Sequence, residues 1–242
     1  WTTQGSPRAV QAIIEDDLAP LLVGQDPFQV RGIGERVFKA TEMSNRGGIV
    51  AAAWSAVETA TMDLAAKLAG LPLHALLGTA HDRVPAYASA GLYGVGKGPD
   101  ALAAEVKGWV EQGFTQVKIK VGGAPLAEDV RRVASVREAI GPGPVLYVDA
   151  LNNLDVAGAI ALAHALAPYD IGFFEAPVSQ YDIQGQAEVA RRIPMPVCGN
   201  ENQAWVVYFR DLITARATHY VQFDVAACGG IQEGQRIGEL AR

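Results

Sequence analysis

Apolar and polar positions follow one another in two different patterns along this chain, and the change falls near residue 80. Over residues 8–78 the apolar positions recur every three to four residues, which predicts a series of amphipathic helices. Asp26 followed by Pro27 is typical of a helix start, because aspartate accepts hydrogen bonds from the first turn and proline fits the first helical position. The alanine-rich run over residues 50–68 predicts a further helix that is largely buried.

From Val84 onward, short apolar runs alternate with helical segments. The predicted strands span residues 84–89, 116–121, 145–149, 171–175, 196–201 and 220–224. Strands that alternate with helices are typical of a parallel sheet built from βαβ units. Six successive units favour a (β/α)8 TIM-type barrel over a doubly wound sheet.

The predicted fold class is therefore α/β, and we expect two domains. Residues 1–80 would form the helical part of an N-terminal α+β capping domain. Residues 81–242 would form the barrel domain, with strands 1–6 visible and a truncation before strand 7. We interpret the sequence as a partial chain, because six strands alone would leave the edges of a barrel open.

Composition excludes several classes of function. Half of the 242 residues are hydrophobic and 19% are charged, which is ordinary for a soluble globular protein. The net charge of −6 gives no basic surface for nucleic acid or an anionic membrane. Cys198 and Cys228 lie far apart and are expected to be free thiols of a cytoplasmic protein. We therefore expect a small-molecule partner, no nucleic acid and no membrane, and we also expect a homo-oligomer.

Ionisable residues end five of the predicted strands. Lys118 and Lys120 end the second strand. The third to sixth strands end, in order, in Asp149, Glu175, Glu201 and Asp224. In a parallel barrel the carboxyl ends of all strands meet at one rim, which is where active sites lie. Two lysines and four carboxylates are thus expected to gather around that rim.

Each of these acids has a structural alternative, since aspartate and glutamate often serve turns and helix caps. The joint pattern favours a site, because clustered carboxylates repel one another and raise one another's pKa. A hard divalent cation removes that repulsion. Mg²⁺ in particular prefers carboxylate oxygens in octahedral geometry and leaves positions open for water or substrate. The pattern therefore predicts a metal site with basic groups beside it.

The two lysines lie on one face of their strand, because side chains at positions i and i+2 point the same way. If that face meets solvent, the strand is an ordinary amphipathic edge. If it points into a site, each ammonium lowers the pKa of the other, and a partly neutral lysine is a useful general base. A bound metal would stabilise the negative charge on a carboxylate substrate as its α-proton leaves.

These residues match a known pattern, and the chain resembles the enolase superfamily, specifically the mandelate racemase branch of the mandelate racemase / muconate lactonizing enzyme family. The matching segments are "GLPLHALLG" ahead of the barrel, "VKIK" on the second strand, "VDA" on the third, "FEAP" on the fourth, "GNEN" on the fifth and "FDVAACGGI" on the sixth. The superfamily uses a lysine or histidine base and a Mg²⁺-stabilised enediolate. The resemblance covers almost the whole chain.

The resemblance implies a role for each strand-end residue. The Mg²⁺ ligands would be Asp149, Glu175 and Glu201. Lys120 would be the base, while Lys118 would bind the substrate carboxylate and depress the pKa of Lys120. Asp224 would orient a histidine from the seventh strand. Separately from the resemblance, Asn202 directly follows Glu201 in the chain and is therefore expected to support that ligand.

Two positions bear on the subgroup. Muconate-lactonizing relatives carry a lysine five residues before the Gly-Gly pair, where this chain has Asp224, as in mandelate racemase and acid-sugar dehydratases. The family usually has asparagine two residues after the first ligand, where this chain has Leu151. None of the chain's own histidines is expected to partner Asp224. His219 would lie about 16 Å away at the opposite end of the same strand, and His164 is expected to be structural.

The glycine-rich segment 91–98 lacks the Lys-Ser/Thr ending of a phosphate-binding loop. We expect it to form a mobile rim loop after the first barrel strand, with Tyr93 as a pocket contact.

The predicted function is Mg²⁺-dependent removal of the α-proton of a carboxylate through an enediolate, leading to dehydration of an acid sugar. A racemase or epimerase of a 2-hydroxy acid could use every residue named above. A non-catalytic barrel that keeps a metal site for stability is a third possibility, although such a site needs no paired lysines.

Overall fold

The computed structural model describes residues 6–45 and 47–242, which form two compact units. The sheet unit comprises Val84–Asn200 and Leu212–Val221. The helical unit comprises the described residues up to Arg83 together with Glu201–Asp211 and Gln222–Arg242. Each unit combines segments that are separate in the chain, so the two units do not test a domain boundary between residues 80 and 81. That boundary stays a prediction.

Six parallel strands form one sheet in the sheet unit, and their order in space is their order in the chain. The strands are β1 Ala88–Ser89, β2 Gln116–Lys120, β3 Val145–Asp149, β4 Ile171–Glu175, β5 Val197–Gly199 and β6 Tyr220–Val221. A doubly wound sheet would reverse its strand order at a switch point, whereas a barrel continues in sequence. The sequential order confirms the predicted α/β fold of barrel type.

The predicted strand boundaries hold best in the middle of the sheet. Strands β3 and β4 span the predicted residues, while β1 and β6 keep only two residues each. β1 and β6 lie at the two ends of the strand order, so each pairs with a single neighbour. The remaining predicted residues of these two strands, 84–87 and 222–224, lie outside any strand.

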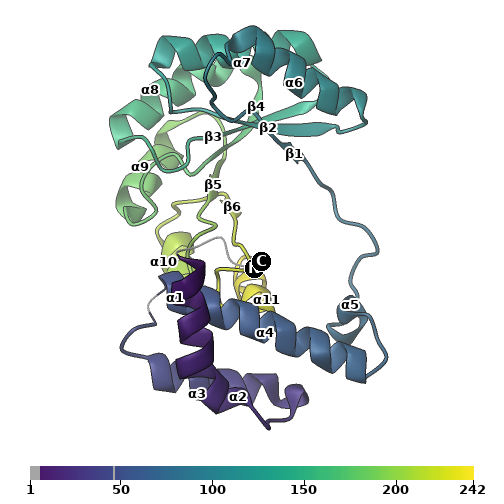
Figure 1. Cartoon of the computed structure of the whole chain (residues 1–242). Helices are drawn as coiled ribbons and strands as arrows, with labels where there is room; N and C mark the ends of the chain where they lie inside the picture. Colours follow the sequence, from purple (N-terminus) through teal and green to yellow (C-terminus); the bar gives the residue numbers. More distant parts are fainter. Residues whose placement is uncertain (1–5, 46) are drawn as a thin grey trace. The chain divides into compact units, whose positions relative to one another are not determined.

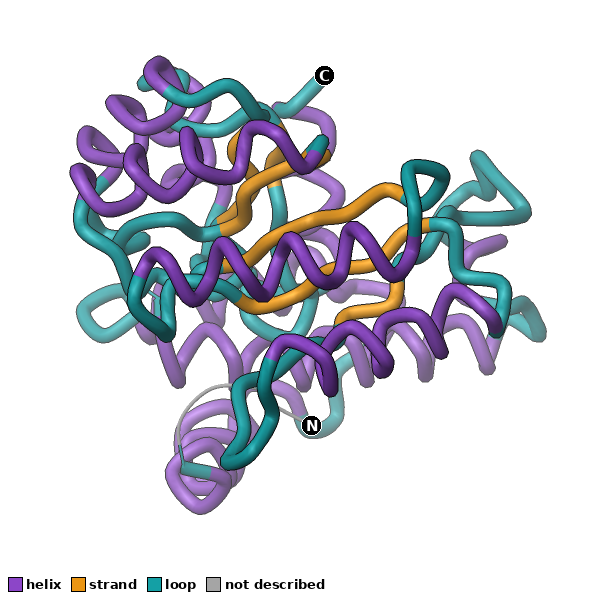
Figure 2. Tube along the Cα trace, turned by 90° about the horizontal axis from the view of Figure 1, so that it is seen from above, coloured by secondary structure: helices purple, strands orange, loops and turns teal. Residues whose placement is uncertain are grey.

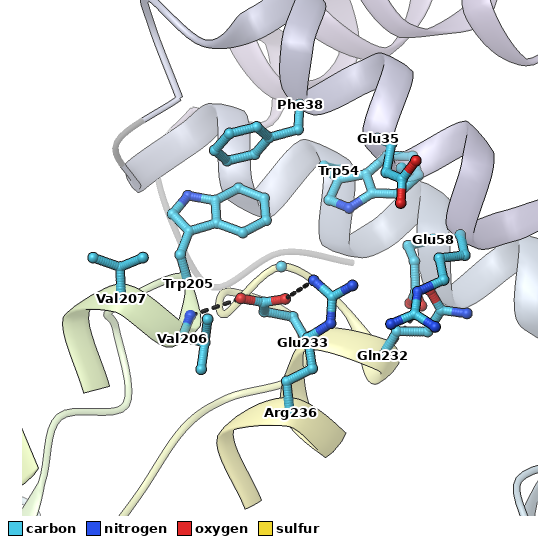
Figure 3. A pocket seen from close by; sticks show the side chains of 13 residues that line it. Glu35, Phe38, Trp54, Glu58, Trp205, Val206, Val207, Gln232, Glu233 and Arg236 are labelled. Atoms are coloured by element: carbon cyan, nitrogen blue, oxygen red, sulfur yellow. Dashed lines mark hydrogen bonds and ion pairs between the residues drawn. The ribbon is translucent and has the colours of Figure 1, made fainter. Parts of the chain in front are cut away.

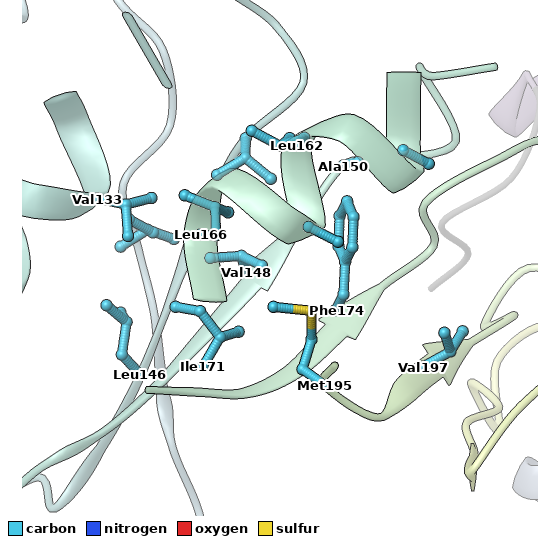
Figure 4. Packing of buried hydrophobic residues seen from close by; sticks show 14 of the residues in the cluster. Val133, Leu146, Val148, Ala150, Leu162, Leu166, Ile171, Phe174, Met195 and Val197 are labelled. Atoms are coloured by element: carbon cyan, nitrogen blue, oxygen red, sulfur yellow. The ribbon is translucent and has the colours of Figure 1, made fainter. Parts of the chain in front are cut away.

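Helices cover one face of this sheet, as Figure 1 shows for α6, α7 and α8. Figure 2 shows the helices and strands from above. The helices of the unit are α6 Pro99–Glu111, α7 Leu126–Ile140, α8 Val156–Leu166, the short 3-10 helix η3 Ala167–Tyr169 and α9 Ile183–Arg192. Leu162 and Leu166 of α8 pack with Val148 and Phe174 of the strands (Figure 4). Full burial of each such side chain contributes about 1.5–3 kcal/mol, so this core holds the strands in place.

The helical unit contains the helices expected before residue 80, with more breaks than the sequence pattern suggests. Its elements are α1 Pro7–Ala12, the π-helix η1 Ile13–Leu18, α2 Ala19–Leu22, the 3-10 helix η2 Pro27–Gln29, α3 Val30–Thr41, α4 Gly48–Leu68, α5 Leu73–Leu76 and α11 Ile231–Leu240. Asp26 accepts a hydrogen bond from the N–H of Phe28 at 2.9 Å, which confirms the predicted cap. α10 Val206–Thr214 begins in this unit and ends in the sheet unit.

Two side chains of α4 hold the start of α11. Glu58 accepts hydrogen bonds from the N–H groups of Ile231 and Gln232 at 2.7 and 3.1 Å. Ser55 accepts one from Gly229 at 2.9 Å. The first turn of a helix has backbone N–H groups without helical partners, and these contacts satisfy them.

Among the described residues, no helix is both long and apolar enough to cross a membrane.

Candidate active site

The alternation of β2 decides where its lysines point. Val117, Ile119 and Val121 are almost completely buried in the core between the sheet and its helices. Lys118 and Lys120 lie on the opposite face, and Lys118 is only 4% exposed. The lysine face is therefore not a solvent-exposed edge, and the ordinary amphipathic alternative is wrong.

The register of three adjacent strands brings both lysines to two carboxylates. Lys120 pairs with Asp149 across β2 and β3, and Asp149 pairs with Glu175 across β3 and β4. The Nζ of Lys118 lies 2.5 Å from Oε2 of Glu175 and 3.4 Å from Oδ2 of Asp149. Lys120 forms an ion pair with Asp149. Four of the predicted site residues thus form one cluster at the carboxyl ends of their strands.

The direction of the pKa shift of Lys118 differs from the one expected from the sequence. Burial alone would lower the pKa of Lys118, but the carboxylates of Glu175 and Asp149 outweigh burial and raise it well above its ordinary value. The expected lowering by a neighbouring ammonium is therefore wrong for Lys118. The reason is that each lysine is closer to a carboxylate than sequence spacing alone can reveal.

Two neighbours of the cluster were missed by the sequence analysis. The ring centroid of Tyr87 lies 5.2 Å from Nζ of Lys118, which is within the range of a cation–π contact. Cys198 on β5 pairs in register with Glu175, and burial raises the pKa of its thiol to about 12. Strand alternation could have placed Cys198 beside Glu175, whereas Tyr87 precedes the paired part of β1 and carries no such signal.

Glu201 and Asp224 belong to the helical unit, where they lie together. The N–H of Asp224 donates to the carbonyl of Glu201 at 3.2 Å, and Nε2 of Gln222 donates to Oε2 of Glu201 at 3.1 Å. Asp224 also accepts a hydrogen bond from the N–H of Ala226 at 2.8 Å. Asp224 therefore closes its own turn, which agrees with the structural alternative. Asn202 follows Glu201 and is half-buried.

The donor set of the sheet unit fits a hard cation. Asp149 and Glu175 are each 1% exposed and stand on neighbouring strands, so they supply oxygen donors side by side. Two buried carboxylates need positive charge nearby, which Lys118 and Lys120 supply here and Mg²⁺ can share. Within the described part of the chain, no three His, Cys, Asp or Glu residues group closely enough to hold a metal ion by themselves.

The histidines that the structure describes have other contacts. Nδ1 of His219 accepts a hydrogen bond from the N–H of Val197 at 3.0 Å, which ties β5 to the start of β6. Nδ1 of His74 lies 2.8 Å from Oγ1 of Thr79. His164 is exposed on α8. The structural role expected for His164 stays a prediction.

The segment after Asp149 adopts an unusual backbone. Leu151 and Asn152 have φ values of 50° and 63°, in the left-handed region that asparagine tolerates better than leucine. The N–H of Leu151 donates to Oδ1 of Asp149 at 2.8 Å, so this turn also fixes the carboxylate. The departure from the family's usual asparagine therefore places a leucine in a strained position next to the cluster.

A separate cavity of about 380 Å³ lies within the helical unit. Figure 3 shows Trp54, Trp205 and Phe38 around it, with Glu233 bonded to the N–H of Val206 and to Arg236. None of the predicted site residues lines this cavity. Glu233 and Arg236 form an ion pair there and Glu58 accepts from backbone N–H groups, so the lysine–carboxylate cluster remains the candidate active site.

Comparison with known families identifies the chain. The model of the "Enolase C-terminal domain-like" family matches residues 101–242, and that of the "Mandelate racemase / muconate lactonizing enzyme, N-terminal domain" family matches residues 1–78. The chain belongs to the mandelate racemase / muconate lactonizing enzyme family of the enolase superfamily, which confirms the resemblance found in its motifs.

Several curated relatives are acid-sugar enzymes. The chain is 33% identical to an arabinonate dehydratase of Saccharolobus solfataricus, over 98% of this chain and 64% of the relative. It is 34% identical to an L-talarate/galactarate dehydratase of Salmonella typhimurium, over 93% and 56%. It is 32% identical to a 3,6-anhydro-alpha-L-galactonate cycloisomerase of Streptomyces coelicolor, over 100% and 66%. The chain thus spans less than two thirds of the length of these relatives.

Solved structures agree. A racemase from Streptomyces coelicolor A3(2) with bound magnesium superimposes with a TM-score of 0.93 at 32% identity, over 98% of this chain and 66% of that chain. A mandelate racemase/muconate lactonizing enzyme from a marine actinobacterium, in complex with magnesium, gives a TM-score of 0.87 at 30% identity, over 98% and 68%. Magnesium is therefore a bound ion in structural relatives of this chain.

Proposed function

We propose that this protein is a Mg²⁺-dependent enzyme that removes the α-proton of a carboxylate substrate through an enediolate, and that it dehydrates an acid sugar. The observation that carries the proposal is the buried pairing of Lys118 and Lys120 with Asp149 and Glu175 at adjacent strand ends. A structural cluster would gain nothing from burying four charges, because apolar residues of similar volume stabilise a core at least as well.

The metal would be held by Asp149, Glu175 and Glu201, with Asn202 supporting Glu201. Hard carboxylate oxygens suit Mg²⁺, and the bound magnesium of the structural relatives supports the assignment. When bound, a divalent cation stabilises the negative charge that develops on a substrate carboxylate during loss of the α-proton.

The two lysines would have unequal roles. Lys118 is 4% exposed and lies between Asp149 and Glu175, so its ammonium suits binding of the substrate carboxylate beside the metal. Lys120 is the less buried of the two and contacts a single carboxylate, so its Nζ is better suited to take the α-proton. Asp224 would orient a histidine that returns a proton to the departing hydroxyl.

The substrate class is supported by the curated relatives, three of which are named as dehydratases of arabinonate, of L-talarate and galactarate, and of L-rhamnonate. One observation favours a second candidate, racemisation or epimerisation of a 2-hydroxy acid: the Streptomyces coelicolor structure is described as a racemase. We further propose a small-molecule carboxylate as the partner and a homo-oligomeric assembly, which sedimentation would test.

The test uses the full-length protein in D₂O with Mg²⁺ and a panel of acid sugars and 2-hydroxy acids, followed by NMR. Loss of the α-proton signal together with a 2-keto-3-deoxy product would support the dehydratase. Exchange with inverted configuration and no elimination would support the racemase instead. No exchange with any substrate would favour a non-catalytic barrel.

A variant pair separates chemistry from folding. Lys120→Ala should abolish exchange while the fold is kept. Lys107→Ala, which removes an exposed lysine of α6, is the matched control and should exchange normally.

A further inference from the structure

The turn that ends β2 is held by side chains from two other elements. The N–H of Gly122 donates to Oδ2 of Asp129 at 2.7 Å, and the N–H of Gly123 donates to the hydroxyl oxygen of Tyr93 at 3.1 Å. The Tyr93 hydroxyl in turn donates to Oδ1 of Asp129. Gly122 lies only two residues beyond Lys120, so this group fixes the backbone directly after the proposed base. We call Tyr93, Asp129, Gly122 and Gly123 the β2 clamp.

The role of Tyr93 in the β2 clamp differs from the role expected from the sequence. Tyr93 was expected to contact a pocket from a mobile loop, whereas its hydroxyl joins the β2 turn to α7. Gly91 of the same loop donates to Glu105 at 3.2 Å and accepts from Arg132 at 3.3 Å. The loop is therefore attached to α6 and α7 at its start.

Asp129 is an unusual residue for its position. Its carboxylate is 1% exposed, and its partners lie in the β2 turn and on Tyr93 rather than on the free N–H groups of its own helix. A helix cap would use those N–H groups instead. Arg132, also 1% exposed, supplies the compensating charge: its Nε lies 3.8 Å from Asp129, and its guanidinium carbon lies 4.1 Å from the centre of the Tyr93 ring.

The clamped turn also contacts the carboxylate strand. A Cβ on Gly123 would lie 2.6 Å from the Tyr93 ring, and one on Gly122 would lie 3.2 Å from Cβ of Ala150. Ala150 follows Asp149 directly, and the N–H of Val121 donates to the carbonyl of Asp149 at 2.9 Å. The turn is thus packed between Tyr93 and the strand that carries the ion-pair partner of Lys120.

We infer that Asp129 is a positioning residue for Lys120, with Tyr93 as its partner. The clamp keeps the last rung between β2 and β3 closed, so that Nζ of Lys120 stays aligned with the reacting carbon of the substrate. Burying an aspartate and an arginine is a poor way to gain stability alone, because apolar packing does as well. The inference rests on the proposed function, in which Lys120 is the base.

The first experiment measures the backbone without using activity. Asp129→Asn and Tyr93→Phe should each speed amide hydrogen exchange at Val121, Gly122 and Gly123 by about tenfold or more, while Ile119 in the middle of β2 stays protected. Glu128→Gln removes a neighbouring charge on the same turn of α7 and should change none of these rates. Unchanged rates at Gly122 in Asp129→Asn would overturn the clamp, whatever the enzyme's activity.

The second experiment uses the full-length enzyme and its best substrate. Asp129→Asn should lower kcat for α-proton exchange by about 10- to 100-fold with KM changed less than about threefold, because a misplaced catalytic group costs rate more than binding. Tyr93→Phe, which keeps the ring, should show a smaller loss of the same kind. An unchanged kcat, or an equal loss in Glu128→Gln, would refute positioning. Wild-type enzyme without exchange on any substrate would refute the proposed function, and the amide measurement would still decide the clamp.

Discussion

Glu58 and Ile231 are joined by a hydrogen bond of 2.7 Å, although 173 residues separate them in the chain. The carboxylate of Glu58 also accepts from Gln232, so one buried side chain of α4 satisfies two N–H groups at the start of α11. Burial raises the pKa of Glu58, even though the two N–H groups oppose this shift. These hydrogen bonds stabilise the start of α11, whereas burial of the charged Glu58 carboxylate costs free energy.

Replacing Glu58 should separate these two effects. Glu58→Ala leaves two backbone N–H groups of α11 without an acceptor and should destabilise the chain by about 1–3 kcal/mol in urea denaturation. Glu58→Gln keeps one acceptor oxygen in a side chain of the same size but replaces the other oxygen with an NH2 donor, so its loss at neutral pH should be smaller than that of Glu58→Ala without being zero. Equal losses in the two variants would contradict the hydrogen-bond account.

The same residue predicts a pH dependence. The pKa of Glu58 is higher in the folded than in the unfolded chain, so folding favours its protonated form. Stability contributed by this group is present below its ordinary pKa of 4.5 and is lost as the pH rises through the raised folded value. The difference in unfolding free energy between wild type and Glu58→Gln should therefore shift against the wild type as the pH increases above 4.5. A difference that is constant from pH 4 to 8 would argue against a raised pKa.

Removing the Lys118 ammonium should take away the lysine partner of the buried Glu175 carboxylate, while Asp149 keeps its ion pair with Lys120. Lys118→Met is expected to cost about 3–5 kcal/mol in urea denaturation, the usual loss when one partner of a buried pair is removed. Lys107→Met is the control, since Lys107 is exposed and lies 3.9 Å from Glu111; it should cost less than about 1 kcal/mol. If the carboxylates bind Mg²⁺, adding it should restore part of the Lys118→Met loss.

Leu151 should be replaceable with a gain in stability. Its backbone is in the left-handed region, which strains a leucine, and its side chain is 45% exposed. Burial of the side chain therefore offsets little of the backbone strain. Leu151→Asn should stabilise the chain by about 0.5–1 kcal/mol, measured by thermal unfolding. Leu126→Asn makes the same change at the same 45% exposure on α7 and should give no gain. A gain at both positions would point to lost surface hydrophobicity rather than relieved strain.

Both cysteines should be unreactive in the folded chain. Cys198 and Cys228 are buried, and burial raises the pKa of each thiol to about 12. Because the thiolate is the nucleophile, a thiol-specific reagent at pH 8 should modify neither residue until denaturant is added, after which both should react. A thiol that reacts at once under native conditions would show that one of these sites opens.

The sequence predicted the sheet well wherever a charge ends a short apolar run. Val145–Asp149 and Ile171–Glu175 are such runs, and their boundaries hold. It also predicted that Lys118, Lys120, Asp149 and Glu175 would gather, because parallel strands align their carboxyl ends. It could not predict which lysine meets which carboxylate, since that depends on register and side-chain reach.

Contacts between side chains that are distant in the chain explain the other differences between the sequence-based predictions and the structure. The raised pKa of Lys118 follows from Glu175, which is 57 residues away, and Tyr93 meets Asp129 across 36 residues. No local pattern contains such pairs. The π-helix Ile13–Leu18 was likewise expected to be an ordinary helical turn, because its apolar spacing resembles that of the α-helix.

The sequential strand order has a consequence for synthesis on the ribosome. Each strand pairs with the strand made just before it, so the sheet can grow from β1 to β6 as the chain emerges, without waiting for distant segments. The two lysines emerge first, on β2, and Glu175 emerges only with β4. A nascent chain that stops before Glu175 offers Lys118 only the longer of its two ion pairs, the one with Asp149 at 3.4 Å. The shorter ion pair, with Glu175, therefore forms only once the fourth strand has been made.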